Sequence, residues 1–235
     1  MIDSLKSFID TMKNTFTKRP QKVIVASFLL LIPIVGFFPT GEFVKMMMRK
    51  MSGEEEVYLP ETETIMTGEN FKHGVVVYFL YFLYLLIYTP FGIVGRLITP
   101  STAYASHSAG IIQIIAALVS FTGTIVAAVY VGWILPAMLV SYAASGGKFA
   151  EAFNLKRIFE FLRYEWVDIL FVNVIGAVFW LFFVITSVFL CALPIIFLNA
   201  LAYPVYFWLL ADVWNKYYLH RTANEMSRSG LTANL

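Results

Sequence analysis

Long apolar stretches recur along this chain, and they limit its fold more than any other feature. Four of them cover about residues 74–98, 109–145, 165–190 and 192–214. A helix of about 20 apolar residues is long enough to cross the hydrocarbon core of a bilayer. Hydrophobic residues make up 59% of the 235 residues and charged residues only 14%, which leaves too little polar surface for a water-soluble globule. We therefore predict an all-α integral membrane protein with four transmembrane helices.

A further apolar run, residues 23–51, is interrupted in its middle. Pro33, Gly36 and Pro39 lie within seven residues of one another. Proline removes a backbone hydrogen-bond donor, and glycine permits a sharp change of direction. We predict a re-entrant hairpin, broken at these three residues, that enters and leaves the membrane on the same face. The alternative is a full first span with a divided third run, which gives five or six crossings.

Polar segments flank and separate these runs. Residues 1–22 and 149–164 place apolar and charged side chains on opposite sides of a helix. We predict two amphipathic interfacial helices on the cytoplasmic side. For the first of them, the alternative is packing against the protein's own cytoplasmic loops. Residues 52–73 are predicted to form an acidic, solvated loop, and residues 215–235 a polar tail that frays.

The distribution of Lys and Arg predicts the orientation, because positive charge near the ends of spans marks the cytoplasmic side. Positive charge gathers in residues 1–22, in residues 148–163 and in the tail. The turn near Cys191 and the loop 99–108 contain no Lys or Arg, so we expect both outside. The membrane bundle, residues 23–214, then belongs to a multi-pass protein of the cell membrane with cytoplasmic N- and C-termini.

Small residues recur at every fourth position of the third run. They are Ala116, Ser120, Thr124, Ala128 and Gly132. Small side chains at this spacing let another helix approach closely, and close packing drives helix association in lipid. The pattern indicates a packing face within the protein or, alternatively, a face for self-association or for another membrane protein.

Tyrosines recur in the run that precedes it, at Tyr78, Tyr81, Tyr84 and Tyr88. A tyrosine hydroxyl inside a membrane needs a hydrogen-bond partner. These side chains either line a polar groove for a ligand or serve as interfacial and packing residues. Asn173 is another deep polar group, and we expect it to form a hydrogen bond between helices.

Residues that carry chemistry are scarce in this sequence. The middle of each predicted span contains no Asp, Glu, Lys, Arg or His, and the three histidines fall in separate loops. Asp168 and Asp212 lie near predicted cytoplasmic ends, where they pair with Arg163 and Lys216 or meet lipid headgroups. The motifs of phosphate loops, zinc-binding helices and nucleophile elbows do not occur. We expect no catalytic residue, no metal site, no cofactor and, at a net charge of +2, no nucleic-acid partner.

Three short stretches carry a resemblance to a known family. They are the residues 31–36 (Leu-Ile-Pro-Ile-Val-Gly), the elbow from Gly53-Glu54-Glu55 to Leu59-Pro60, and Ala152-Phe153 before the two closing helices. With these stretches, most of residues 20–215 resembles the prokaryotic, largely archaeal membrane family catalogued as domain of unknown function four thousand and thirteen. The resemblance implies a polytopic membrane architecture and brings no established activity, so no functional residue is transferred from it.

The function predicted from these patterns is not enzymatic. We expect a membrane-embedded component that binds lipid or a partner, assembles with itself, or forms a subunit of a larger membrane complex. The alternative is a carrier or channel for a neutral or lipidic solute, built on the break at Pro33–Pro39 and on the tyrosine face.

Overall fold

The computed structural model describes residue 13 and residues 20–32, 34–53, 65–98, 108–189 and 193–228. Every regular element in these residues is a helix, and they contain no strand, which confirms the all-α prediction. Most of the amphipathic segment 1–22, most of the acidic loop and Pro33 lie outside the described residues.

The helices follow one another with short connections in most places. They are α2 (Pro20–Leu31), α3 (Phe37–Met51), α5 (Gly68–Ile98), α6 (Ser108–Val129), the π-helix η1 (Tyr130–Ile134), α7 (Leu135–Ala144), the 3₁₀ helix η2 (Phe149–Phe153), α8 (Leu155–Phe189) and α9 (Leu193–Arg228). The segments α6, η1 and α7 are consecutive in the chain, as the length of the third apolar run predicts.

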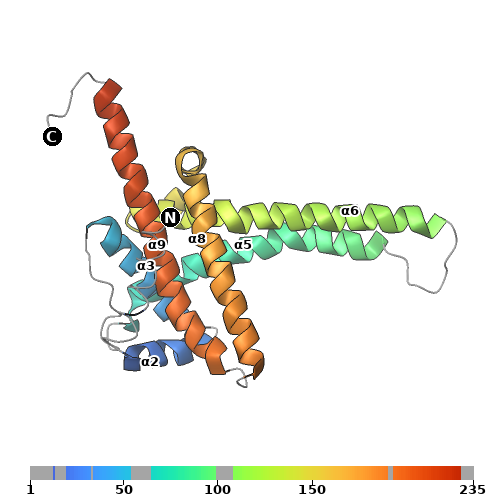
Figure 1. Ribbon diagram of the computed structural model, residues 1–235, viewed down its shortest axis with the longest axis horizontal. Coiled ribbons are helices and arrows are strands. Elements are labelled where there is room, and N and C mark those ends of the chain that lie inside the picture. The colour runs from blue at the N-terminus through green and yellow to red at the C-terminus, as the bar shows by residue number, and fades with distance from the viewer. Residues whose placement is uncertain are drawn as a thin grey trace.

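Two pairs of long helices dominate the shape. Helices α5 and α6 lie side by side and project from the rest of the molecule, whereas α8 and α9 lie side by side and run across that direction (Figure 1). Helix α3 packs against both α5 and α9, and α2 packs against α9. A helix that crosses a bilayer lies within some tens of degrees of its normal. In this arrangement, therefore, the four predicted spans do not form one parallel bundle.

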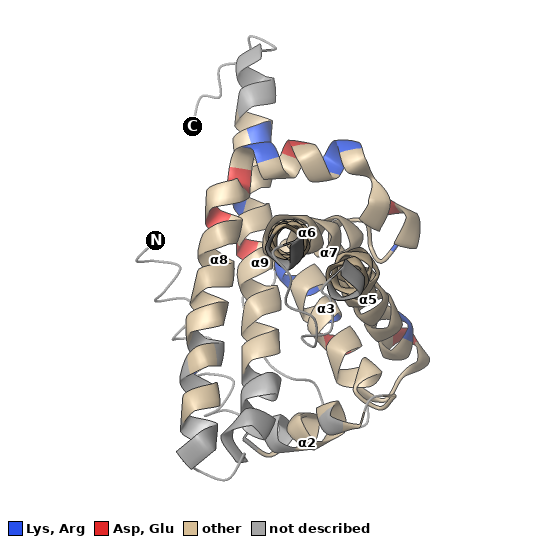
Figure 2. Ribbon diagram, turned by 90° about the vertical axis from the view of Figure 1, so that its right-hand side faces the viewer, with Lys and Arg blue, Asp and Glu red and all other residues tan. Residues whose placement is uncertain are grey.

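The interrupted first run forms two helices joined at a corner. Helix α2 ends at Leu31, and the Gly36 amide donates to the carbonyl of Ile32 at 2.7 Å in the turn before α3. Pro39 lies in the first turn of α3, where its missing N–H removes no helical hydrogen bond. In Figure 2, α2 lies across the end of α3 instead of beside it. A return to the same face of the membrane remains a prediction.

Three element boundaries differ from those predicted. Helix α5 begins at Gly68 instead of 74, and α9 continues as a helix to Arg228, beyond the predicted end of its span at 214. Of the predicted connector 149–164, residues 149–153 form the 3₁₀ helix η2, and residues 155–164 share helix α8 with the span after it, with a kink at Glu165 (φ −119°, ψ 17°). The predicted fraying tail 215–235 is helical as far as Arg228.

The core lies where α3, α7 and α9 meet. Its largest fully buried side chains from these helices include Phe43, Met46, Met47, Leu135, Leu139, Tyr142, Phe207 and Tyr217. All residues from Leu135 to Ala143 are buried. The outer parts of α5 and α6, in contrast, carry many exposed apolar side chains.

Candidate functional site: a groove between two exposed apolar helices

The projecting pair has the composition of membrane spans. Within the described residues, two helical segments are long and apolar enough to cross a membrane, Gly68–Gly95 and Ile111–Ala144. Only 17% and 22% of their most apolar windows are buried inside the protein, so most of this apolar surface faces outward. The exposed side chains include Phe82, Leu85, Leu86, Ile93 and Val94 on α5 and Ile111, Ile114, Leu118, Phe121 and Ile125 on α6. An apolar surface of this extent requires lipid or a partner to cover it.

Glycines let α5 and α6 approach closely at the outer end of the pair. A Cβ atom on Gly95 of α5 would overlap the Ser120 hydroxyl, and one on Gly123 of α6 would overlap the ring of Phe91. Ala116 is buried at the same interface, with its carbonyl next to Gly95. The first two members of the small-residue series therefore pack against α5 within the chain.

The next two members of the series line a groove. Thr124 and Ala128 lie beside an open cavity of about 780 Å³ between α5 and α6. Among the residues that the structure describes, its lining is Tyr81, Tyr84, Tyr88, Thr124, Ala127, Ala128 and Val131. The structure thus brings three of the four predicted tyrosines and two of the five small residues to one site. We call this site the α5–α6 groove.

The tyrosines follow the groove from the core to the exposed end of the pair. Tyr81 and Tyr84 pack against the core cluster, whereas Tyr88 is exposed. The rings of Tyr84 and Tyr88 are stacked, with centroids 6.0 Å apart and planes at 8°. Tyr78 is not part of the lining. Its ring instead meets that of Phe37 at 4.7 Å, and its hydroxyl lies over Gly36 at the break of the first run.

The inner end of the groove is held by the π-helix η1, to which Val131 belongs. The Tyr130 hydroxyl donates to the carbonyl of Leu80 at 2.7 Å and ties η1 to α5. Pro136 has no N–H for the carbonyl of Gly132, and the Asn173 side-chain amide of α8 donates to this oxygen at 3.0 Å. Single-turn π-helices often mark functional sites. The fifth small residue, Gly132, therefore joins helices through its carbonyl oxygen.

Asn173 also accepts a hydrogen bond from the Tyr206 hydroxyl of α9 at 3.3 Å. This confirms the predicted role of Asn173 between helices. The π-helix itself was not predicted, although Pro136 is the sequence signal for it, because a proline inside a long helix displaces the backbone bonds of the turn before it.

A buried polar cluster at the base of α5 was also missed. The Glu42 carboxylate, with a side chain 3% exposed, accepts hydrogen bonds from Arg49 at 3.0 Å and from the Asn70 amide at 2.9 Å. Next to it, the ring nitrogen Nδ1 of His73 and the hydroxyl of Tyr142 are 2.7 Å apart. The seven-residue spacing of Glu42 and Arg49, two turns on one helix face, is the signal that could have indicated their pairing.

Acidic side chains inside α8 and α9 are paired with lysines of neighbouring helices. Lys216 bonds Asp168 and lies 3.4 Å from Glu165, while Lys50 lies 3.3 Å from Asp212. The hydrogen bond to Asp168 raises the pKa of Lys216. Ion pairing, the first of the two predicted alternatives, is confirmed for Asp168, but its partner is Lys216 of α9, and among the described residues no ion pair joins it to Arg163. Asp212 pairs with Lys50 on α3, which is distant in the sequence, so the sequence around Asp212 does not predict this ion pair.

Comparison with known proteins identifies a family and no activity. A family model described as a protein of unknown function (DUF4013) matches residues 25–199. No curated protein and no solved structure matches the chain. The match agrees with the resemblance seen in the sequence and covers well over half of the chain. The chain belongs to the DUF4013 family of proteins of unknown function.

Proposed function

We propose that this protein is a non-catalytic integral membrane component that binds a lipid in the α5–α6 groove. The observation that carries the proposal is the position of the groove, which lies between two helices with exposed apolar surfaces. A bilayer that surrounds these helices brings acyl chains directly to the opening. Cavities of roughly 300–1,000 Å³, mostly apolar with a few placed polar groups, are typical of small-molecule sites. The tyrosine hydroxyls and Thr124 supply those polar groups.

The alternative function, a carrier or channel, has less support. It would use Pro33, Gly36 and Pro39 together with Tyr81, but of these residues only Tyr81 lines the groove. Gly36 is buried and covered by the hydroxyl of Tyr78, and Pro33 is outside the described residues. The geometry therefore favours a ligand-binding site rather than a transport path through the protein.

Filling the groove tests the lipid site. The double variant Thr124→Leu/Ala128→Leu places two larger side chains in the cavity, and we expect it to retain about tenfold less lipid, a change of ~1.4 kcal/mol. The measurement is native mass spectrometry of the protein released from lipid nanodiscs.

The matched control adds leucines to the outer surface of the same helix. Val126 and Val129 are exposed and do not line the groove, so Val126→Leu/Val129→Leu should leave lipid retention unchanged. Equal lipid retention in both double variants would refute the proposed site. The same refutation follows if the groove variant keeps its lipid and loses a copurifying membrane protein instead.

The proposed orientation places both termini and Glu55 in the cytoplasm and the loop 99–107 outside. Cys191 is the only cysteine and lies in the turn that we expect outside. If the α8–α9 pair crosses the membrane, as the sequence predicts, a membrane-impermeant maleimide labels Cys191 in intact cells. If the pair instead lies in the membrane plane, across the direction of α5 and α6 as in Figure 1, Cys191 is protected. In a Cys191→Ser background, Glu55→Cys should be labelled only after the membrane is opened. Labelling of Glu55→Cys from outside contradicts the re-entrant first run. Protection of Cys191 would mean that the α5–α6 pair crosses the membrane without the α8–α9 pair.

A further inference from the structure

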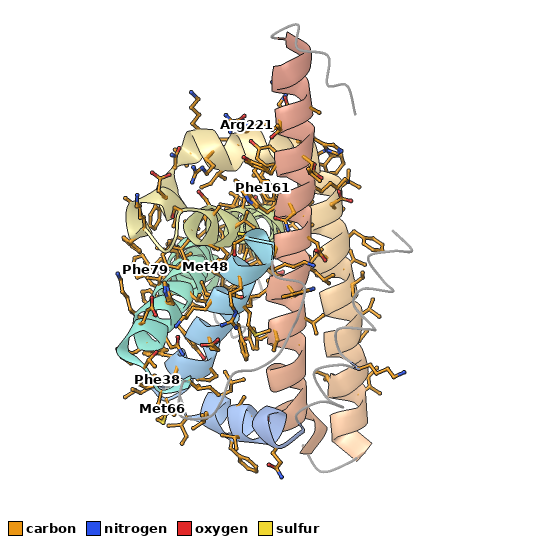
Figure 3. The ribbon with its side chains drawn as sticks, turned by 90° about the vertical axis from the view of Figure 1, so that its left-hand side faces the viewer. Phe38, Met48, Met66, Phe79, Phe161 and Arg221 are labelled. Atoms are coloured by element: carbon orange, nitrogen blue, oxygen red, sulfur yellow. The ribbon has the colours of Figure 1, made fainter. Side chains whose placement is uncertain are left out.

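The first part of α8, residues 155–164, has two apolar faces instead of one. One face is buried: Ile158 and Phe161 are almost completely covered, and Phe161 packs against Trp214 and Tyr217 of α9 (Figure 3). The second face consists of Leu155, Phe159 and Leu162, spaced by four and three residues, and Trp166 follows just beyond the kink at Glu165. Of these residues, Leu162 also packs in part against the core. We call this second face the connector stripe.

The connector stripe is largely uncovered. The residues Leu155, Phe159 and Trp166 are 64%, 63% and 50% exposed. In a soluble protein, a helix that packs one apolar face against its own chain normally presents polar side chains on its other faces. Such a stripe requires an apolar environment.

Cations lie directly beside this stripe. Lys156 and Arg163 each follow a stripe residue in sequence, so they lie on one flank of the stripe, and both are exposed. The acidic residues in and just before the segment are already engaged, because Glu151 of η2 pairs with Arg157 at 3.4 Å, Glu160 with Arg221 at 3.8 Å and the buried Glu165 with Lys216 at 3.4 Å. Among the residues that the structure describes, no ion pair involves Lys156 or Arg163. Their charge is thus available to an external anion.

The segment lies at the depth of a membrane interface. The ring of Phe149, in η2, contacts that of Phe79 on α5, with centroids 5.6 Å apart. Phe79 lies five residues inside the predicted span that begins at 74. At ~1.5 Å per residue, this contact is about 7 Å beyond the start of the span. Interfacial helices bury their apolar face by about 5–10 Å.

The segment also has the direction of a surface helix. In Figure 2, α5 and α6 are seen end-on, and the first part of α8, with blue Lys and Arg segments, runs across the top of the view. If α5 and α6 stand along the membrane normal, this part of α8 lies parallel to the membrane plane. The direction rests on the proposed crossing of the membrane by the α5–α6 pair.

We propose that residues 155–166 form a binding surface for anionic phospholipids. Leu155 and Phe159 insert among the acyl chains, and Lys156 and Arg163 contact the phosphate headgroups of the same leaflet. A basic residue near an anionic membrane surface contributes about 1 kcal/mol to attraction, so two cations give a clear preference for anionic over zwitterionic lipid. This site is separate from the α5–α6 groove and recognises headgroup charge.

Photo-crosslinking of the full-length chain tests this surface. A benzoylphenylalanine in place of Phe159 reports which lipid lies against the stripe, in nanodiscs made from equal parts of phosphatidylcholine and phosphatidylglycerol. We expect mainly phosphatidylglycerol adducts. Lys156→Gln/Arg163→Gln should reduce the ratio of phosphatidylglycerol to phosphatidylcholine adducts by about tenfold. High salt should reduce the ratio in the parent protein as well.

A second position separates this inference from the proposed membrane crossing. Leu118 on α6 is 59% exposed, and benzoylphenylalanine there should form lipid adducts whose ratio the Gln variants leave unchanged. The proposed surface is overturned if lipid adducts form at position 118 but not at position 159. It is also overturned if the Gln variants leave the adduct ratio at position 159 unchanged. Neither result affects the proposed membrane crossing. Adducts of position 159 to another protein overturn the surface too. Failure to form lipid adducts at both positions overturns the membrane crossing itself.

Discussion

The Gly74→Ala variant should be less stable than the parent chain by about 3 kcal/mol, at the upper end of what overpacking costs. Gly74 of α5 faces the backbone of α3, and a Cβ atom there would overlap the carbonyl oxygen of Phe37. Gly41 of α3 meets the backbone of Asn70 in the same way. Backbone atoms cannot move aside as the end of a side chain can, so the two helices must separate. The measurement is the free energy of unfolding in mild detergent, followed by tryptophan fluorescence during titration with a denaturing detergent.

The Gly176→Ala variant, in contrast, should be more stable than the parent chain. Gly176 lies inside α8. Within the described part of the chain, no heavy atom outside its chain neighbours and its own helix backbone lies within 4 Å of the Cβ position. Alanine is favoured over glycine in an open helix interior by about 0.5–1 kcal/mol. Equal effects of Gly41→Ala, Gly74→Ala and Gly176→Ala would show that helix propensity, and not the contact between α3 and α5, decides their stability.

These glycines show where sequence reasoning stops. The sequence predicts the long helix α5 and the continuous helical segment of α6, η1 and α7, because the length and the composition of a membrane helix can be read from one sequence. The packing role of Ala116 and Ser120 follows from their spacing in the same local way. Gly41 and Gly74, in contrast, become important only because two distant segments cross there. Their spacing within either segment carries no such information.

The α5–α6 groove could be predicted from the sequence only in part. The tyrosine series and the small-residue series were each recognised as a helix face, and the structure places Tyr81 opposite Thr124 and Ala128 in one lining. What sequence could not provide is the facing of the two helices, which depends on Gly95, Gly123 and the π-helix. The direction of α8 and α9 across this pair was equally hidden, because hydropathy reports the length of a helix and not its angle to others.

The second large effect concerns the buried carboxylate of Glu42. Arg49→Met removes the cation that lies 3.0 Å from it, while the Glu42 side chain stays 97% covered. We expect a loss of about 3 kcal/mol in the free energy of unfolding, because a buried charge is left without its partner. Glu42→Leu alone should cost about 2 kcal/mol, since the Arg49 side chain is 32% exposed and can turn toward solvent.

The double variant Glu42→Leu/Arg49→Met should recover most of this loss. Replacing a buried ion pair by apolar side chains of similar size is often neutral, so the sum of the single effects overestimates the double one by at least about 1 kcal/mol. Lys45→Met is the control on the same helix. Lys45 pairs with Glu69 at 2.9 Å, but the Glu69 side chain is 64% exposed, and its loss should cost less than about 1 kcal/mol. Additive effects of Glu42→Leu and Arg49→Met, or a Lys45→Met effect as large as that of Arg49→Met, would mean that burial does not control these ion pairs.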